Sequence, residues 1–242
     1  MTTNLTPLSS KVMLKCGILE EYHDKDFTDY FAHPDKWKEL KSQIDEWNKA
    51  NPHRPIIITE KHLQEGREVL ERVATYSRNL HIARKKGISL LLAGNNGTGK
   101  TLLGVSILKQ AIRRGFTAQM TSLEGIIRAY TDGWTSIEDR KLFDQRIRNV
   151  DFLLIDDVGK EYKAKNSELT EVMFDNLIRY RVGRRKPFIL TTNTDPESML
   201  NRYGNSLMSN LEGKAIKLKV VGFDYRKVIL SKNLWKELTN DE

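Results

Sequence analysis

The sequence predicts an α/β fold in which a parallel β-sheet is covered by helices on both faces. From Gly87 onward, short and almost uninterrupted apolar runs alternate with stretches of helical periodicity. Strands that are apolar throughout are buried on both sides, which is typical of parallel sheets. The length of 242 residues is enough for one substantial core with an appendage and is short for two full domains.

The region before Gly87 is expected to be a helical extension of this core. Residues 1–32 have weak periodicity and predict a tail followed by an irregular segment. Four apolar residues at spacings of three and four predict an amphipathic helix over 35–50: Trp37, Leu40, Ile44 and Trp47. Prolines 52 and 55 end that helix, and Thr59 is suited to cap a second helix that reaches about Arg84. We therefore divide the chain into an extension, 1–86, and a core, 87–242.

The core is expected to contain five strands separated by helices. The strands are expected at 88–94, near 117–121, and at 151–156, 187–193 and 215–221. The helices are expected at 101–114, in parts of 123–148, and at about 168–182 and 224–238. This alternation predicts crossover connections between neighbouring parallel strands.

Composition favours a cytoplasmic protein that contacts polyanions. The formal net charge is +8, and basic side chains bind phosphates by releasing counterions, although a basic surface without a partner has the same composition. One cysteine excludes an internal disulfide. No apolar run approaches the roughly 20 residues that span a bilayer, and the N-terminus has no secretory pattern, so no membrane partner is expected.

The junction between the first core strand and its helix carries a complete G-x-x-x-x-G-K-[ST] pattern: Gly94, Asn95, Asn96, Gly97, Thr98, Gly99, Lys100 and Thr101. Glycine lets backbone N–H groups wrap a phosphate, and the helix N-terminus adds its dipole. Lys100 is expected to reach the β- and γ-phosphates of a nucleoside triphosphate, and the Thr101 hydroxyl to ligate Mg²⁺. The alternative is a glycine-rich turn without a ligand.

Polar residues follow two later strands of the core. Asp156 and Asp157 come directly after four apolar residues, and active sites of parallel sheets form at that end of the strands. Asp156 is the candidate metal ligand, and Asp157 the candidate group that polarises water. Asn193 ends the next strand, where an amide can position water near the γ-phosphate; a helix cap or turn residue is the alternative.

This order of motifs resembles that of AAA+ ATPases, and the details resemble the DnaC/IstB family of bacterial and phage helicase loaders and transposition helper ATPases. The resemblance covers about 15–230, with an insertion around 33–58. The matching segments are Gly17-Ile18-Leu19 through Tyr22 and Phe27, then 91–101, 151–159, 177–193 and 222–226.

The resemblance implies an AAA+ core over 87–242, with little or no separate lid domain, that binds ATP and Mg²⁺. It implies that Lys100 and Thr101 hold phosphate and metal, and that Asp156 and Asp157 take the metal and water roles. Asn193 matches the first sensor residue. Arg226 matches the second sensor, a cation that stabilises charge at the γ-phosphate.

Three departures from the family pattern bear on its mechanism. The second acid is Asp157, where AAA+ proteins often have glutamate. Asn210 stands where the family usually has an intersubunit arginine, and Arg202 is the candidate substitute. The third departure is a short segment before the match: only about 15 residues precede it, so partner contacts are expected on that tail, on the insertion or on another surface.

Basic clusters provide candidate nucleic-acid contacts. Lys160, Lys163 and Lys165 follow the metal strand and are expected to face single-stranded nucleic acid in an assembled ring. Other clusters end predicted helices, where cations also favour the helix dipole: Arg84-Lys85-Lys86, Arg113-Arg114 and Arg184-Arg185-Lys186.

The leading functional hypothesis is an ATPase that loads a replicative helicase onto single-stranded DNA as a homo-oligomeric ring or spiral. A transposition helper that binds duplex DNA is the main alternative. A nucleotide-binding adaptor with weak hydrolysis is motivated by Asn210. A small-molecule kinase is disfavoured because the pattern of Asn193 and Arg226 fits AAA+ proteins better and no arginine-rich lid is visible.

Overall fold

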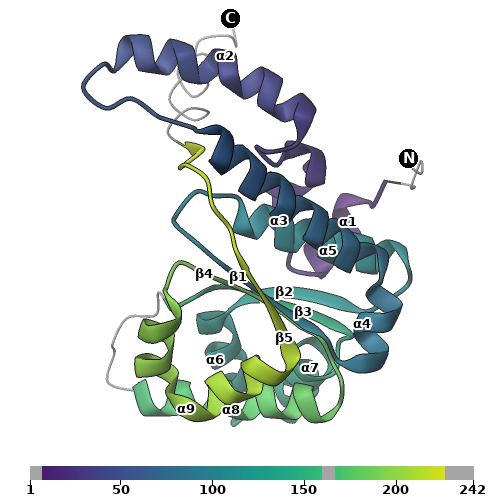
Figure 1. Ribbon diagram of the computed structural model, residues 1–242. Coiled ribbons are helices and arrows are strands. Elements are labelled where there is room, and N and C mark those ends of the chain that lie inside the picture. Colours follow the sequence, from purple (N-terminus) through teal and green to yellow (C-terminus); the bar gives the residue numbers. More distant parts are fainter. Residues whose placement is uncertain (1–6, 160–166, 227–242) are drawn as a thin grey trace, which may run out of the picture.

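The computed structural model describes residues 7–159 and 167–226 and contains a parallel five-stranded sheet at its centre (Figure 1). The spatial order of the strands is β2-β3-β4-β1-β5. Their bounds are β1 Ser89–Ala93, β2 Ala118–Ser122, β3 Phe152–Val158, β4 Phe188–Thr192 and β5 Ala215–Lys219. All four pairings are parallel, so the predicted fold class is confirmed.

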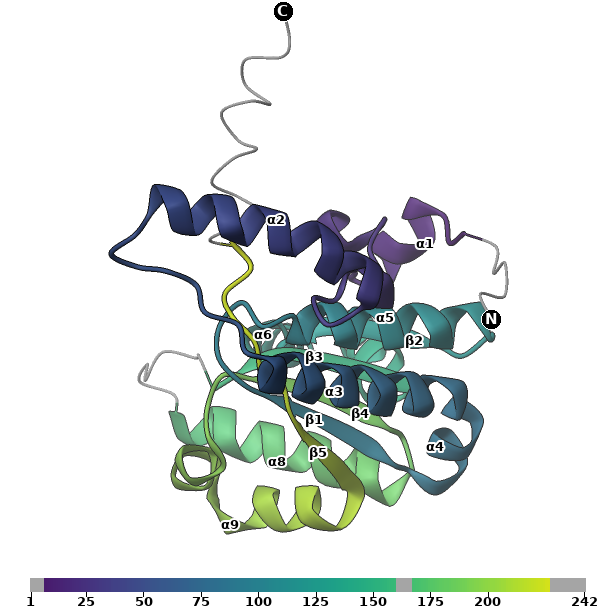
Figure 2. The same cartoon turned by 45° about the horizontal axis from the view of Figure 1, so that its top comes forward.

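Helices cover both faces of this sheet (Figures 1 and 2). One face carries α3 Glu60–Arg78, α4 Leu80–Lys86 and α5 Lys100–Arg113, and α2 Pro34–Ala50 forms an outer layer beyond them. The other face carries α6 Leu123–Asp132, α7 Ile137–Phe143, a π-helical turn η3 Asp144–Arg148, α8 Ser167–Gly183 and α9 Pro196–Lys214. Before α2, the chain forms α1 Ser10–Lys15 and two short 3-10 helices, η1 Glu20–Tyr22 and η2 Phe27–Asp29.

The sheet separates two hydrophobic cores. Leu90 and Leu92 of β1 pack with α3 and α5, whereas Leu91 packs with α8 and α9 on the other side. The same alternation holds in β3, where Leu154 and Leu153 enter opposite cores. Because side chains alternate across a strand, a strand buried on both faces must be apolar at every position. This is the physical reason for the uninterrupted apolar runs.

Several elements differ from the sequence-based expectations. The helix expected from Thr59 to about Arg84 is two helices, because the chain breaks at Asn79, whose amide donates to the Thr75 carbonyl. Helix α9 was not predicted, because a proline near its start is as compatible with a turn as with a helix. Pro196 occupies the first turn of α9, where its missing N–H is tolerated, and the Asp195 side chain caps that turn through the Ser198 N–H.

Two further expectations concern the ends of the chain. The irregular segment expected within 1–32 contains α1 and two 3-10 helices. Nearly all of the helix expected over 224–238 lies outside the described residues. Within 7–159 and 167–226, no helix is both long and apolar enough to cross a membrane.

Candidate nucleotide-binding site

The phosphate loop connects β1 to α5 and has the backbone that its glycines allow. Gly97 and Gly99 have φ angles of 72° and 87°, in the left-handed region that favours glycine. Gly94 and Gly97 also admit close neighbours. A Cβ on Gly94 would collide with the carbonyl oxygen of Val220, and one on Gly97 with the carboxylate of Asp224. The glycines therefore serve both the loop and the chain segment that crosses it.

Lys100, the first residue of α5, lies at the centre of the loop. Its side chain is buried, and its ammonium donates to the carbonyl oxygens of Gly94 at 2.9 Å and Asn95 at 2.6 Å. It also donates to Oδ1 of Asn193 at 2.5 Å. The phosphate loop and the end of β4 are thus joined through one cation.

Thr101 and Asp156 form a pair of oxygen donors beside this lysine. The Thr101 hydroxyl donates to Oδ1 of Asp156 at 3.0 Å. Burial raises the pKa of Asp156, and hydrogen bonds from Thr191 and Thr101 partly oppose that rise. A hydroxyl and a carboxylate are ligands that Mg²⁺ accepts, with phosphate and water oxygens completing its shell. In the described ranges, no group of three or more His, Cys, Asp or Glu residues is placed to hold a metal by itself.

A β-bulge brings the two acids to the same site. Ile155 pairs with Leu190 and Val158 with Thr192, so Asp156 and Asp157 together face the single residue between those two in β4. Asp157 has a φ angle of 57°, which is uncommon for a residue other than glycine. Backbone strain of this kind gathers at functional sites, where the surrounding structure holds it in place.

Thr191 and Asn193 connect the acids to the phosphate loop. The Thr191 hydroxyl accepts from the Asp157 N–H at 2.9 Å and donates to Oδ1 of Asp156 at 2.5 Å. The Asn193 amide donates to Oδ1 of Asp157 at 2.8 Å, while its oxygen accepts from Lys100. Asn193 therefore links the candidate water-activating acid to the loop lysine.

The N-terminal segment forms a further wall of the site, which sequence reasoning missed. Lys109 of α5 is buried and donates to the carbonyl oxygens of Tyr22, His23 and Lys25 at 2.6–2.8 Å. This clamp holds Tyr22 beside the metal-side residues. Burial raises the pKa of Tyr22 to about 12, helped by nearby negative charges that include Asp156. Tyr22 belongs to the segment that resembles the family, but no local pattern indicates that its ring lies beside the metal-side residues.

The C-terminal segment after β5 crosses the phosphate loop. The Val220 N–H donates to the Ala93 carbonyl at 2.7 Å, and the Tyr225 N–H donates to the Gly97 carbonyl at 3.2 Å. Arg226 lines the cleft and donates from Nε to Oδ1 of Asp224 at 3.2 Å, with 59% of its side chain exposed. Asp224 is thus a further residue that sequence reasoning missed, and it orients the candidate sensor arginine.

These elements enclose a cleft of about 540 Å³, within the range of nucleotide and cofactor sites. It is lined by the phosphate loop from Asn96 to Leu102, by Asp156, Asp157, Asn193, Tyr225 and Arg226, and by N-terminal residues that include Tyr22, Lys25 and Lys36. The loop, its lysine and the oxygen donors therefore fit a nucleoside triphosphate with Mg²⁺.

Of the other candidate residues, the structure describes the side chain of Asn210 only. Lys160, Lys163 and Lys165 lie outside the described residues. Arg202 falls within α9, but its side chain is not among those described. The Asn210 amide donates to the Ser206 carbonyl one helical turn earlier, at 3.0 Å.

The sheet order together with the phosphate loop, the paired acids and Asn193 defines a P-loop nucleotide-binding protein of the AAA+ class. The sequence profile of the family described as IstB-like ATP binding protein matches residues 64–212, more than half of the chain. The chain therefore belongs to the family of IstB-like ATP-binding proteins, and the suspected DnaC/IstB relationship is confirmed.

Solved structures of replication proteins share this fold. The crystal structure of the DnaC helicase loader superposes with a TM-score of 0.63 at 18% identity, covering 84% of this chain and 100% of that one. DnaI gives a TM-score of 0.54 at 19% identity and covers 71% and 88%, respectively. The replication initiator DnaA bound to AMPPCP and single-stranded DNA gives 0.54 at 24% identity and covers 75% and 53%, so this chain spans about half of that protein. A search among curated proteins found no match.

Proposed function

We propose that this chain is an ATPase of DNA replication that delivers a ring-shaped replicative helicase onto single-stranded DNA. The observation that carries the proposal is the connected set around one cleft. In that set, Lys100 contacts Asn193, Asn193 contacts Asp157, and Thr101 contacts Asp156. Such a set combines a phosphate cradle, a metal-binding pair and a water-positioning pair, as ATP hydrolysis to ADP and phosphate requires.

Each group has a role in the proposed reaction. The loop amides and Lys100 hold the phosphates, and Thr101 with Asp156 would hold Mg²⁺, which neutralises charge on the transferred phosphoryl group when bound. Asp157 orients and polarises the attacking water, and its hydrogen bond from Asn193 fixes the carboxylate in place. Arg226 supplies a positive charge at the γ-phosphate from the C-terminal segment.

The loading role rests on similarity of the fold over the full length of a helicase loader. We propose a homo-oligomeric ring or spiral with ATP, which binds single-stranded DNA and one replicative helicase in the cytoplasm. Asn210 supplies no cation to a neighbouring subunit, so we expect slow hydrolysis that a partner stimulates. Lys160, Lys163 and Lys165 remain the proposed DNA contacts within such an assembly.

Two alternatives have specific support. The family match favours a transposition helper that binds duplex DNA and activates a transposase. Asn210, whose amide is used within α9, favours an adaptor that binds ATP and hydrolyses little of it.

Affinity capture with the Asp157→Asn variant in the presence of ATP tests the proposal, with mass spectrometry as the readout. Recovery of a replicative helicase by this variant, and not by Lys100→Ala, is the expected result. Recovery of a transposase would replace the loader by the transposition helper. Recovery of neither, with undetectable ATP turnover by the wild type, would replace it by the adaptor.

A further inference from the structure

Three helices end in the same way where the amino ends of the strands lie, at the edge of the sheet opposite the nucleotide cleft. After α4, Gly87 has φ 72° and the next N–H donates to the Ala83 carbonyl; after α5, Gly115 has φ 80° and the next N–H donates to the Ala111 carbonyl. After α8, the Lys186 N–H donates to the Arg181 carbonyl at 2.8 Å. This ending requires a left-handed residue and normally uses glycine. At α8 that residue is Arg185, with φ 51°.

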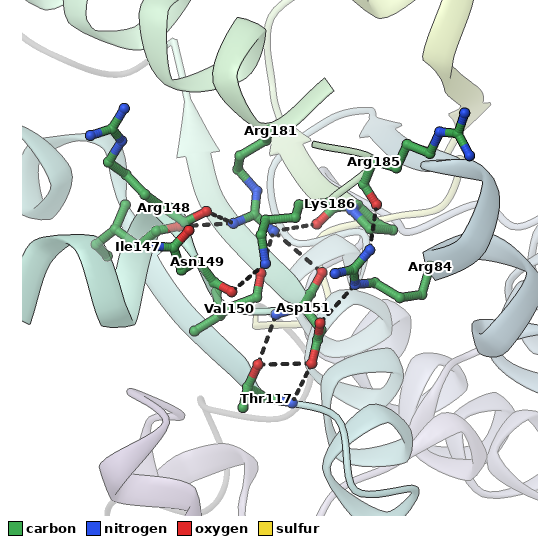
Figure 3. A network of polar contacts seen from close by, with 11 residues as sticks. Arg84, Thr117, Ile147, Arg148, Asn149, Val150, Asp151, Arg181, Arg185 and Lys186 are labelled. Atoms are coloured by element: carbon green, nitrogen blue, oxygen red, sulfur yellow. Dashed lines mark hydrogen bonds and ion pairs between the residues drawn. The ribbon is translucent and has the colours of Figure 1, made fainter. Parts of the chain in front are cut away.

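Some cations at this edge have a structural task (Figure 3). Arg181 is fully buried and donates to carbonyl oxygens of the turns on either side of it, including those of Ile147, Val150 and Pro187. Lys186 donates to the Asn149 carbonyl, and Arg84 donates to Asp151 and to the Arg185 carbonyl. The positive charges of these side chains offset the partial negative charges of carbonyl groups at helix ends and turns, as cations near the C-termini of helices commonly do.

Four more cations at this edge do not have that task. Lys85, Lys86, Arg184 and Arg185 are all exposed. The guanidinium of Arg185 extends away from the network, and only its backbone carbonyl takes part in it (Figure 3). Arg184 lies over the ring of Tyr180, 5.4 Å from its centroid, and Arg148 lies over the same ring at 4.1 Å. The aromatic ring therefore holds two guanidinium groups at the surface.

Three carboxylates near this edge, among the residues that the structure describes, are already paired. Asp151 binds Arg84 at 2.7 Å, and Asp144 binds Arg148 at 3.1 Å. Glu212 shares a surface hollow with Lys86 but pairs with Lys217 at 3.8 Å. The positive charges at this edge also affect a neighbouring lysine. Burial lowers the pKa of Lys186, and the charges of Arg84 and Arg184 lower it further.

We propose that Lys85, Lys86, Arg184 and Arg185, here called the basic edge, bind the phosphate backbone of nucleic acid. Within residues 7–159 and 167–226, none of these four cations pairs with a carboxylate. Exposed cations of this kind bind phosphates with release of counterions. Arginine also presents a planar fork of donors that matches phosphate oxygens. Arg185 occupies a backbone position where glycine would be unstrained, as at Gly87 and Gly115. A strained residue whose side chain extends into solvent points to a role for that side chain.

The basic edge deepens the proposed function, since it is a proposed binding surface for the nucleic acid on which the protein acts. It rests on the proposed function only for the statement that this nucleic acid belongs to DNA replication. The nucleotide cleft lies at the carboxyl ends of the strands, whereas the basic edge lies at their amino ends. Binding at the basic edge is therefore expected without ATP.

Arg185→Gly tests the proposal, because the structural and binding effects of this change have opposite signs. Glycine relieves the left-handed strain and keeps the backbone carbonyl that accepts from Arg84, so the melting temperature should stay equal or rise. Binding of a fluorescein-labelled oligonucleotide, followed by anisotropy over a salt series, should weaken. The slope of log affinity against log salt should fall by about 0.7 for single strands and about 0.9 for duplex DNA for each lost phosphate contact.

A triple variant and a matched control extend the test. Lys85→Gln, Lys86→Gln and Arg184→Gln together should lower the slope by about 2 or more, whereas Lys38→Gln, Lys41→Gln and Lys49→Gln on α2 remove the same charge and should leave it nearly unchanged. Unchanged binding by Arg185→Gly and the edge triple, or an equal loss in the control, would overturn the proposal. So would binding of polyglutamate as tight as that of DNA.

The outcome separates this inference from the proposed function. If Lys100→Ala loses ATP binding and keeps salt-sensitive binding at the basic edge, both proposals stand. If the wild type binds no ATP and the edge variants still weaken nucleic-acid binding, only the proposed function fails. If ATP binding is intact and the edge variants bind normally, only the basic edge fails.

Discussion

The hydroxyl of Thr191 donates to the carboxylate of Asp156 at 2.5 Å, and the same oxygen accepts from the Asp157 N–H at 2.9 Å. One threonine of β4 therefore binds both residues of the β-bulge in β3 that presents the two acids. A side chain that orients a metal ligand commonly affects metal affinity as much as it affects folding.

Thr191→Val should separate these effects, because valine keeps the shape and removes the hydroxyl. The Asp157 N–H loses its acceptor, so we expect a loss of about 1–3 kcal/mol in the free energy of unfolding, measured by urea denaturation. Nucleotide binding in the presence of Mg²⁺ should weaken about 10-fold or more. Thr191→Ser keeps the hydroxyl and serves as the control. Equal behaviour of the two variants would show that the hydroxyl has no such role.

Asp156→Asn should change stability in opposite directions with and without ligand. Because burial raises the pKa of Asp156 in the folded protein, its contribution to stability is present at low pH and is lost as pH rises through the folded pKa. Without Mg²⁺ and ATP at neutral pH, the variant should therefore melt at a higher temperature than the wild type, and the difference should shrink on acidification. With Mg²⁺ and ATP, the wild type should gain more stability. A variant that melts lower without ligand contradicts this account.

Lys100→Ala should abolish ATP binding, measured by isothermal titration calorimetry. The ammonium lies within 2.9 Å of loop carbonyls, where it is placed to meet the β- and γ-phosphates. Circular dichroism checks that the variant folds. Normal ATP affinity in a folded Lys100→Ala protein would disprove the assignment of the site.

Asp157→Asn should keep ATP affinity within about 3-fold and slow turnover by about 100-fold or more, which is the usual contribution of a general base. Asparagine tolerates the left-handed backbone at this position and still accepts a hydrogen bond from Asn193. Phosphate release under saturating ATP is the measurement. An unchanged rate would remove Asp157 from the water-activating role.

Lys109→Met should loosen the N-terminal wall of the cleft. Methionine has a similar length but leaves the three carbonyl oxygens without their donor, at a cost of about 1–3 kcal/mol in unfolding free energy. ATP affinity should fall as well, since Tyr22 and Lys25 line the cleft. Lys41→Met on the exposed face of α2 is the control. Unaltered ATP affinity, despite the stability loss, would show that the wall does not contact the nucleotide.

Local sequence patterns predicted those parts of the fold that depend on local physics. The apolar runs of β1 and β3 follow from burial on both faces of a strand, and the phosphate loop is a contiguous pattern whose glycines set its own backbone. The helix α9 was missed because proline at its first turn looks the same, in sequence, as proline in a turn. Break and cap positions such as Asn79 depend on how helices pack and are weakly encoded.

The sequence by itself determined the fold class and pointed to the phosphate loop and the candidate acids, because these features depend on local patterns: alternating apolar runs, the spacing of glycines, and acids at the end of a buried strand. The tertiary structure alone decided which distant residues complete the site. Thr191 meets Asp156 through a bulge between two strands, and Lys109 clamps a segment more than 80 residues away. It also gathered separate basic clusters into one edge. Contacts of this kind follow from the register of strands and the packing of helices, which no short stretch of sequence specifies.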